Sequence, residues 1–149
     1  MAGEVVLGYD GVSSGAALET ATQIAAAFKR PLVIVFGYQP AALIGGETGD
    51  LRKAIKELGE TFTAEATETA HKIDPSVEIK VELVDNRPAE AILEAADAYD
   101  ALAVVVGATS RGPVTGAMLG SVTYNVVHRS TRPVVVVPTP PDADADDAE

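Results

Sequence analysis

The chain has 149 residues, of which 47% are hydrophobic, and carries a formal net charge of −11. This length suits one domain with a single core, and the negative charge argues against a general nucleic-acid binder, which needs clustered Lys and Arg. The chain has no cysteine, no recognisable secretion signal and no run of the roughly 18–20 apolar residues that a membrane span requires, so we expect a cytoplasmic protein without thiolate metal sites, disulfides or membrane partners.

Valine- and isoleucine-rich runs alternate with segments whose apolar residues recur at helical spacing. In chain order they predict a strand at Glu4–Asp10, a helix at Ala17–Phe28, a strand at Leu32–Tyr38, a helix at Asp50–Ile73, a strand at Val77–Asp85, a short helix from Pro88, a strand at Leu102–Gly107, a helix at Leu119–Arg129 and a strand at Val134–Val137. The alternation of polar and apolar residues in 77–85 indicates a strand with one wetter face or at an edge of the sheet. Ser13 and Ser14 are suited to cap the first helix.

Strands of this composition, separated by helices, predict a parallel sheet that is covered on both faces. Right-handed crossovers then give a doubly wound α/β fold. We expect its five strands in the order 3-2-1-4-5. We expect residues 1–139 to form this single domain and residues 140–149 to be an acidic, disordered tail. In such a sheet a ligand lies at the carboxyl ends of the first and fourth strands, where Asp10 and Gly107 are expected.

The segment from Leu102 to Pro138 has the layout of a phosphate-binding turn. Its strand ends in Gly107, glycines recur in the loop that follows, and Gly120-Ser121 begins a helix. Glycine allows the main chain to approach a ligand closely, and a helix N-terminus offers unpaired N–H groups to an anion. The segment therefore predicts a nucleotide site.

From Glu4 to Pro138 the chain resembles the universal stress protein family, whose ATP-binding pattern is G-x2-G-x9-G-S/T. Gly107 and Gly120-Ser121 match that pattern at the right separation, and Ser110 stands in place of the second glycine. The resemblance implies a stress-response protein that binds ATP or AMP, with Mg²⁺ accompanying the nucleotide. It also implies a homodimer that acts as a sensor or adaptor without efficient catalysis.

The residues expected at the nucleotide are Asp10, Phe36, Val106, Gly107, Ser110, Arg111, Gly112, Gly120, Ser121 and Val122. By resemblance, the residues around Ser121 would hold the phosphates, and Val106 would line the sugar. Asp10 would meet the ribose or a metal-bound phosphate. The end of the second strand, at Phe36 and its two neighbours, would meet the adenine edge through its main chain. Arg111 is expected either at a γ-phosphate or exposed on the loop.

Several of these residues also have a purely structural interpretation. Gly107 and Gly112 suit a tight turn, Gly120-Ser121 suits an ordinary helix start, and Asp10 suits a local pairing or a cap. Ser110 would weaken phosphate binding if its position requires a positive φ, but its hydroxyl could instead donate to a phosphate oxygen.

Three functions remain open from the sequence. The first is the nucleotide-binding homodimer, and the second is a nucleotide-free dimerisation or interaction module of the same fold. The third is a slow ATPase or an adenylating enzyme, for which the sequence has no Walker G-x4-GK-S/T motif and offers no catalytic residue. In the dimeric alternatives the resemblance assigns the subunit contact to the last strand, Val134, Val135, Val136 and Val137, which is too apolar to be left exposed.

Overall fold

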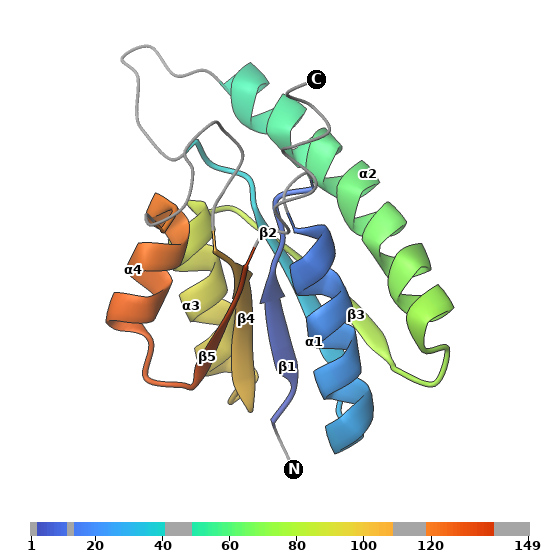
Figure 1. Ribbon diagram of the computed structural model, residues 1–149. Coiled ribbons are helices and arrows are strands. Elements are labelled where there is room, and N and C mark those ends of the chain that lie inside the picture. Colours follow the sequence, from blue (N-terminus) through green and yellow to red (C-terminus); the bar gives the residue numbers. More distant parts are fainter. Residues whose placement is uncertain (1–2, 12–13, 41–48, 109–118, 139–149) are drawn as a thin grey trace, which may run out of the picture.

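The computed structural model describes residues 3–11, 14–40, 49–108 and 119–138. Its elements in chain order are β1 (Val5–Gly8), α1 (Gly15–Phe28), β2 (Leu32–Gly37), α2 (Gly49–Ile73), β3 (Ile79–Val84), α3 (Pro88–Ala98), β4 (Ala103–Gly107), α4 (Ser121–Arg129) and β5 (Val134–Val137). The strands form one parallel sheet in the order β3-β2-β1-β4-β5 (Figure 1). The predicted fold class and strand order are confirmed. The expected tail, residues 140–149, lies outside the described residues.

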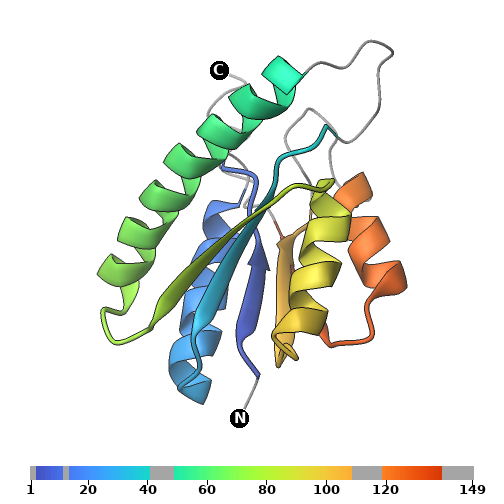
Figure 2. The same cartoon turned by 180° about the vertical axis from the view of Figure 1, so that it is seen from behind.

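Helices cover both faces of the sheet, α1 and α2 on one side and α3 and α4 on the other (Figure 2). Successive residues of β1 divide between the two layers, because Val5 and Leu7 pack under α1 whereas Val6 packs against α3. All three side chains are fully buried. This burial on both faces explains why the central strands read as continuous apolar runs rather than as alternating patterns.

The central strand is shorter than its two neighbours at its carboxyl end. Gly8, the last residue of β1, pairs with Val35, and β2 continues to Gly37. On the other side Leu7 pairs with Val105, and β4 continues to Gly107. The first strand thus ends two residues earlier than predicted, and the step leaves a notch between β2 and β4. The notch lies where the strand order reverses, which is the usual ligand position in such sheets.

The two edge strands differ in what they present to solvent. In β3 charged and apolar residues alternate, and its side chains are half-buried or exposed, which confirms the edge position predicted for this segment. In β5 all four residues are valines and all are half-buried. Among the described residues, no helix is both long and apolar enough to cross a membrane.

Candidate functional site

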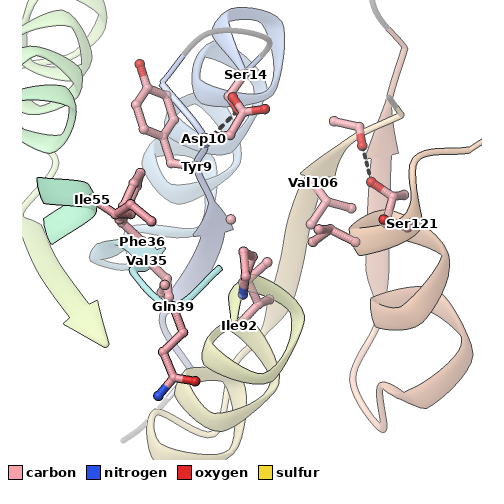
Figure 3. A pocket seen from close by; sticks show the side chains of 16 residues that line it. Tyr9, Asp10, Ser14, Val35, Phe36, Gln39, Ile55, Ile92, Val106 and Ser121 are labelled. Atoms are coloured by element: carbon pink, nitrogen blue, oxygen red, sulfur yellow. Dashed lines mark hydrogen bonds between the residues drawn. The ribbon is translucent and has the colours of Figure 1, made fainter. Parts of the chain in front are cut away.

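A cavity of about 420 Å³ occupies the notch at the carboxyl ends of the strands (Figure 3). Its volume is in the range typical of small-molecule sites. Six of the residues predicted from the sequence line it: Asp10, Phe36, Val106, Gly107, Ser121 and Val122. A seventh, Gly120, is the N-cap of α4 beside it. Ser110, Arg111 and Gly112 lie outside the described residues.

Two glycines in the cavity wall allow α3 to approach the sheet closely. A Cβ at Gly8 would lie 2.4 Å from Cδ1 of Ile92, and a Cβ at Gly37 would lie 2.8 Å from the carbonyl oxygen of Asn86. Both positions therefore exclude larger residues, and Ile92 can reach the cavity as an apolar wall residue. Neither Gly8 nor Ile92 was singled out from the sequence, because their roles depend on which helix packs over β1.

The wall between β4 and α4 is held by two hydrogen bonds. The Thr123 hydroxyl donates to the carbonyl oxygen of Gly107 over 2.5 Å, and the main-chain N–H of Gly120 donates to the carbonyl of Ala108 over 2.9 Å. Together they fasten the start of α4 to the end of β4. Thr123, which is 4% exposed, was not singled out from the sequence. Its only sequence signal is its spacing of three residues from the buried Val126 on the same helix face.

The first turn of α4 presents main-chain N–H groups towards the notch. Gly120 has an extended conformation, and Tyr124 is the first residue whose N–H bonds back within the helix, to the Gly120 carbonyl. The N–H groups of Ser121, Val122 and Thr123 precede that bond, so the helix itself supplies them with no acceptor. Such a turn attracts an anion.

On the opposite wall Asp10 and Ser14 bond to each other (Figure 3). The Ser14 hydroxyl donates to Oδ1 of Asp10 over 2.7 Å and accepts from the Asp10 main-chain N–H over 3.1 Å. Ser14 is the N-cap of α1 by position, but its side chain makes no capping bond, so the predicted cap by Ser14 is wrong. Ser13, the other predicted cap, lies outside the described residues. The hydroxyl is already committed to the Asp10 turn, and the Asp10 carboxylate is oriented beside the cavity.

The third wall is apolar and comes from the residue after β1, from β2 and from α2. Tyr9, Phe36 and Ile55 line it, and the Phe36 ring lies against Phe62, with the ring centres 6.3 Å apart. Burial, followed by the nearby Asp10 and Glu65 carboxylates, raises the pKa of Tyr9, so its phenol keeps its proton at neutral pH. Neither Tyr9 nor Ile55 was singled out from the sequence, since both match ordinary core patterns.

Gln39 closes the cavity beyond the end of β2. Its side-chain nitrogen donates to both the main-chain carbonyl and the carboxylate of Asp85, each over 3.1 Å. Within the described ranges, no group of three or more His, Cys, Asp or Glu side chains is arranged to hold a metal ion. The cavity therefore combines one anion-attracting wall, one carboxylate and one apolar wall.

Comparisons with known proteins identify related proteins of the same fold. The model of the universal stress protein family matches residues 1–138. A solved universal stress protein in complex with cAMP is 31% identical, with a TM-score of 0.69, covering 94% of this chain and 100% of that one. Two structures of a universal stress protein from Archaeoglobus fulgidus share the fold. One is 23% identical (TM-score 0.72; 92% and 99% covered), and the other, in complex with dAMP, is 22% identical (TM-score 0.68; 91% and 97% covered). No curated protein matches the chain.

Proposed function

The chain belongs to the universal stress protein family, and from the geometry of its crevice we propose that it binds an adenine nucleotide, ATP or AMP, as a sensor or adaptor in a stress response. The observation that carries this proposal is the notch above the short β1. It sets the first turn of α4 across from Asp10, with an apolar wall beside both. The relative in complex with cAMP supports the same ligand class.

The phosphates would lie at the start of α4. The main-chain N–H groups of Ser121 and Val122, with the Ser121 hydroxyl, are suited to a phosphate oxygen. Gly107 would let the phosphate chain pass over the end of β4, and Val106 would line the ribose. Thr123 acts from behind this site by holding α4 against Gly107.

The adenine would lie against the apolar wall, with its edge at the end of β2. Tyr9 N–H donates to the Val35 carbonyl, so strand alternation turns the main-chain groups of Gly37 to the same side, beyond the end of β1. Those of Phe36 turn towards β3, and its ring packs on α2 at Gly59. We therefore assign the main-chain contact with the base to Gly37.

Asp10 fits a magnesium ion that is carried in by the nucleotide. A carboxylate is a hard oxygen ligand, and Mg²⁺ at nucleotides is held by one or two carboxylates together with phosphate oxygens. Asp10 is the only carboxylate among the described residues of the cavity wall. The ion would accordingly depend on the phosphates for the rest of its ligands.

We also propose that the protein is not an efficient catalyst. ATP hydrolysis needs a group that positions or deprotonates a water molecule. The described wall contains no histidine or lysine, and its one carboxylate is bonded to Ser14. The phenol of Tyr9, whose pKa is raised, is a poor base.

The last part of the proposal is a homodimer that forms through β5. Val104 N–H bonds the Pro133 carbonyl and Ala108 N–H bonds the Val137 carbonyl, so the odd-numbered residues of β5 face β4. The main-chain groups of Val134 and Val136 then point to the open edge of the sheet.

A proline at Val136 would remove an outward donor, and a proline at Val135 would remove one that bonds β4. Light scattering should show that Val136→Pro is a folded monomer, and a Val136→Pro variant that remains dimeric would exclude this contact.

Calorimetry tests the nucleotide site. Protein stripped of nucleotide by unfolding and refolding is titrated with ATP, ADP, AMP and cAMP, with GTP as the control for base selectivity. Binding of the adenine nucleotides in preference to GTP is expected. If none of them binds at millimolar concentration, the proposal fails. If Ser110→Gly then restores binding, the native chain is the nucleotide-free module instead.

A further inference from the structure

A second cavity, of about 330 Å³, lies in the groove between α3 and α4. It shares Pro88, Ser121 and Val122 with the first cavity, so the two spaces adjoin along these residues. Arg87 and Arg129 line the part of the groove that the first cavity does not include. Neither the sequence motif nor the proposed nucleotide contacts use these arginines.

The groove is a locally cationic place on an acidic protein. Nη1 of Arg129 lies 2.5 Å from Oε2 of Glu90, and Nε of Arg87 lies 3.8 Å from Oε1 of the same carboxylate. Two guanidinium groups therefore share one carboxylate, which leaves an excess of one positive charge, whereas the chain as a whole carries −11. Glu90 also holds both side chains over the groove although each remains about half exposed, at 48% and 51%.

The two guanidinium groups can bind an anion without releasing Glu90. Each guanidinium carries five N–H donors, and the contacts with Glu90 engage one nitrogen of each. Paired arginines suit a phosphoryl group in particular, because their planar forks match its oxygens in a bidentate manner. A carboxylate ligand would meet the same positive charge, but it has fewer acceptor oxygens than a phosphoryl group to offer the two guanidinium groups.

We propose that this arginine groove binds a second phosphoryl group of the nucleotide that occupies the crevice. The inference rests on the proposed function, because the shared wall at Ser121 is where the first phosphate is expected. The second group can belong to the 5′ phosphate chain or to the ribose, and the chemistry is the same in both cases. The groove would make the protein sensitive to how many phosphoryl groups the nucleotide carries.

The test compares ligands that differ by one phosphoryl group. AMP, ADP and adenosine 3′,5′-bisphosphate are titrated calorimetrically into the wild-type protein, into a variant with both Arg87→Gln and Arg129→Gln, and into Arg132→Gln. Arg132 is the matched control, since it is paired with carboxylates at the opposite end of α3. The double variant should lose about tenfold or more in affinity for ADP or for the bisphosphate, and AMP should change less than about twofold. Whichever ligand loses affinity identifies the 5′ chain or the ribose as the source.

An unchanged preference among the three ligands in the double variant would overturn the proposal. Glu90→Gln provides the opposite change, because it keeps both arginines and removes their carboxylate, and it should strengthen binding of the same ligand. Inorganic pyrophosphate separates this inference from the proposed function. In ¹⁵N spectra it should shift the Nε–H signals of Arg87 and Arg129 but not that of Arg132, even if AMP binds nowhere. Equal shifts at all three arginines would show non-specific attraction and refute the groove.

Discussion

The side chains at the amino end of the sheet bond to one another, whereas main-chain groups at its carboxyl end face a cavity. At the amino end Lys80 Nζ lies 2.9 Å from Oε2 of Glu4 and 5.4 Å from the centre of the Tyr99 ring, and the Tyr99 hydroxyl donates to Glu82. These side chains satisfy one another and join β3 to the start of β1 and to the end of α3. At the carboxyl end the strands stop at different heights, and the main-chain groups there face a cavity.

This contrast predicts that the amino end contributes mainly to stability and the carboxyl end to ligand binding. Polar groups that already have partners contribute to stability, whereas groups left at a cavity are available to a ligand. Substitutions at the amino end should therefore change unfolding and leave binding intact. Substitutions at the carboxyl end should weaken binding, whether or not they also change unfolding.

The largest effect is expected for Ser121→Asp. The side chain is exposed in the first helical turn, where a carboxylate is favourable to the helix but repels a phosphate. AMP affinity should fall about 100-fold or more, with no loss in melting temperature. Thr61→Asp, which adds the same charge at an exposed position of α2, is the control and should bind AMP normally. Calorimetry measures the AMP affinity of both variants. Equal affinities would show that the first turn of α4 does not bind the phosphate.

Thr123→Val should have the next largest effect. The substitution keeps the shape but deletes the hydroxyl that joins α4 to the Gly107 carbonyl, so AMP affinity should fall about tenfold. The matched control is Thr22→Val. Thr22 is also a buried threonine, but its hydroxyl donates to Leu18 within α1. Both variants should lose about 1 kcal/mol of stability in urea unfolding, and only Thr123→Val should lose affinity. A similar loss of AMP affinity in Thr22→Val would show that lower stability, and not the lost contact with Gly107, weakens binding.

Tyr99→Phe tests the amino end. It removes the hydroxyl that donates to Glu82, and unfolding should become easier by about 0.5–1 kcal/mol, since solvent partly screens the pair. AMP affinity should not change. Tyr124→Phe, at an exposed phenol on α4, should change neither quantity. A Tyr99→Phe protein with normal stability and weakened binding would contradict the assignment of stability to the amino end of the sheet.

The smallest effect is expected in the pH dependence of stability. The hydrogen bond to Glu82, with burial, raises the pKa of Tyr99 to about 12, above the ordinary value of 10.0. Because the folded pKa is the higher one, this contribution is complete below pH 10 and is lost as the pH rises towards 12. Urea unfolding between pH 9 and about 12 should therefore show a steeper loss in the wild type than in Tyr99→Phe. Identical slopes would mean that the hydroxyl contributes nothing.

Acid should weaken the contact between Glu4 and Lys80 at the amino end of the sheet by protonating Glu4. Burial by itself would raise the pKa of Glu4, but the hydrogen bond and the charge of Lys80, together with main-chain hydrogen bonds, outweigh burial and leave the pKa below 4.5. The contribution of Glu4 is then present above its unfolded pKa and is lost as the pH falls through the folded value. Lys80→Met should flatten this acid limb in the same measurement.

The parts of the site that the sequence predicted are those that repeat a local pattern. Gly107 and Gly120-Ser121 were expected from their spacing, and Asp10 from its place after the first strand; all lie at or beside the cavity. Ser14 was expected as a cap because serine often is one, but its hydroxyl bonds Asp10 instead. The competing partner was four residues away, and only the folded turn shows which bond is made.

Patterns of neighbouring residues were enough to predict the elements and a parallel sheet covered on both faces, because valine runs buried on both faces and helical spacings are local properties of the chain. The tertiary structure alone decided that β1 stops before both of its neighbours, that Ile92 reaches the cavity over Gly8, and that Thr123 reaches Gly107. Each of these features joins residues from different elements. Their distances depend on how helices pack on the sheet, and no spacing along the chain encodes that packing.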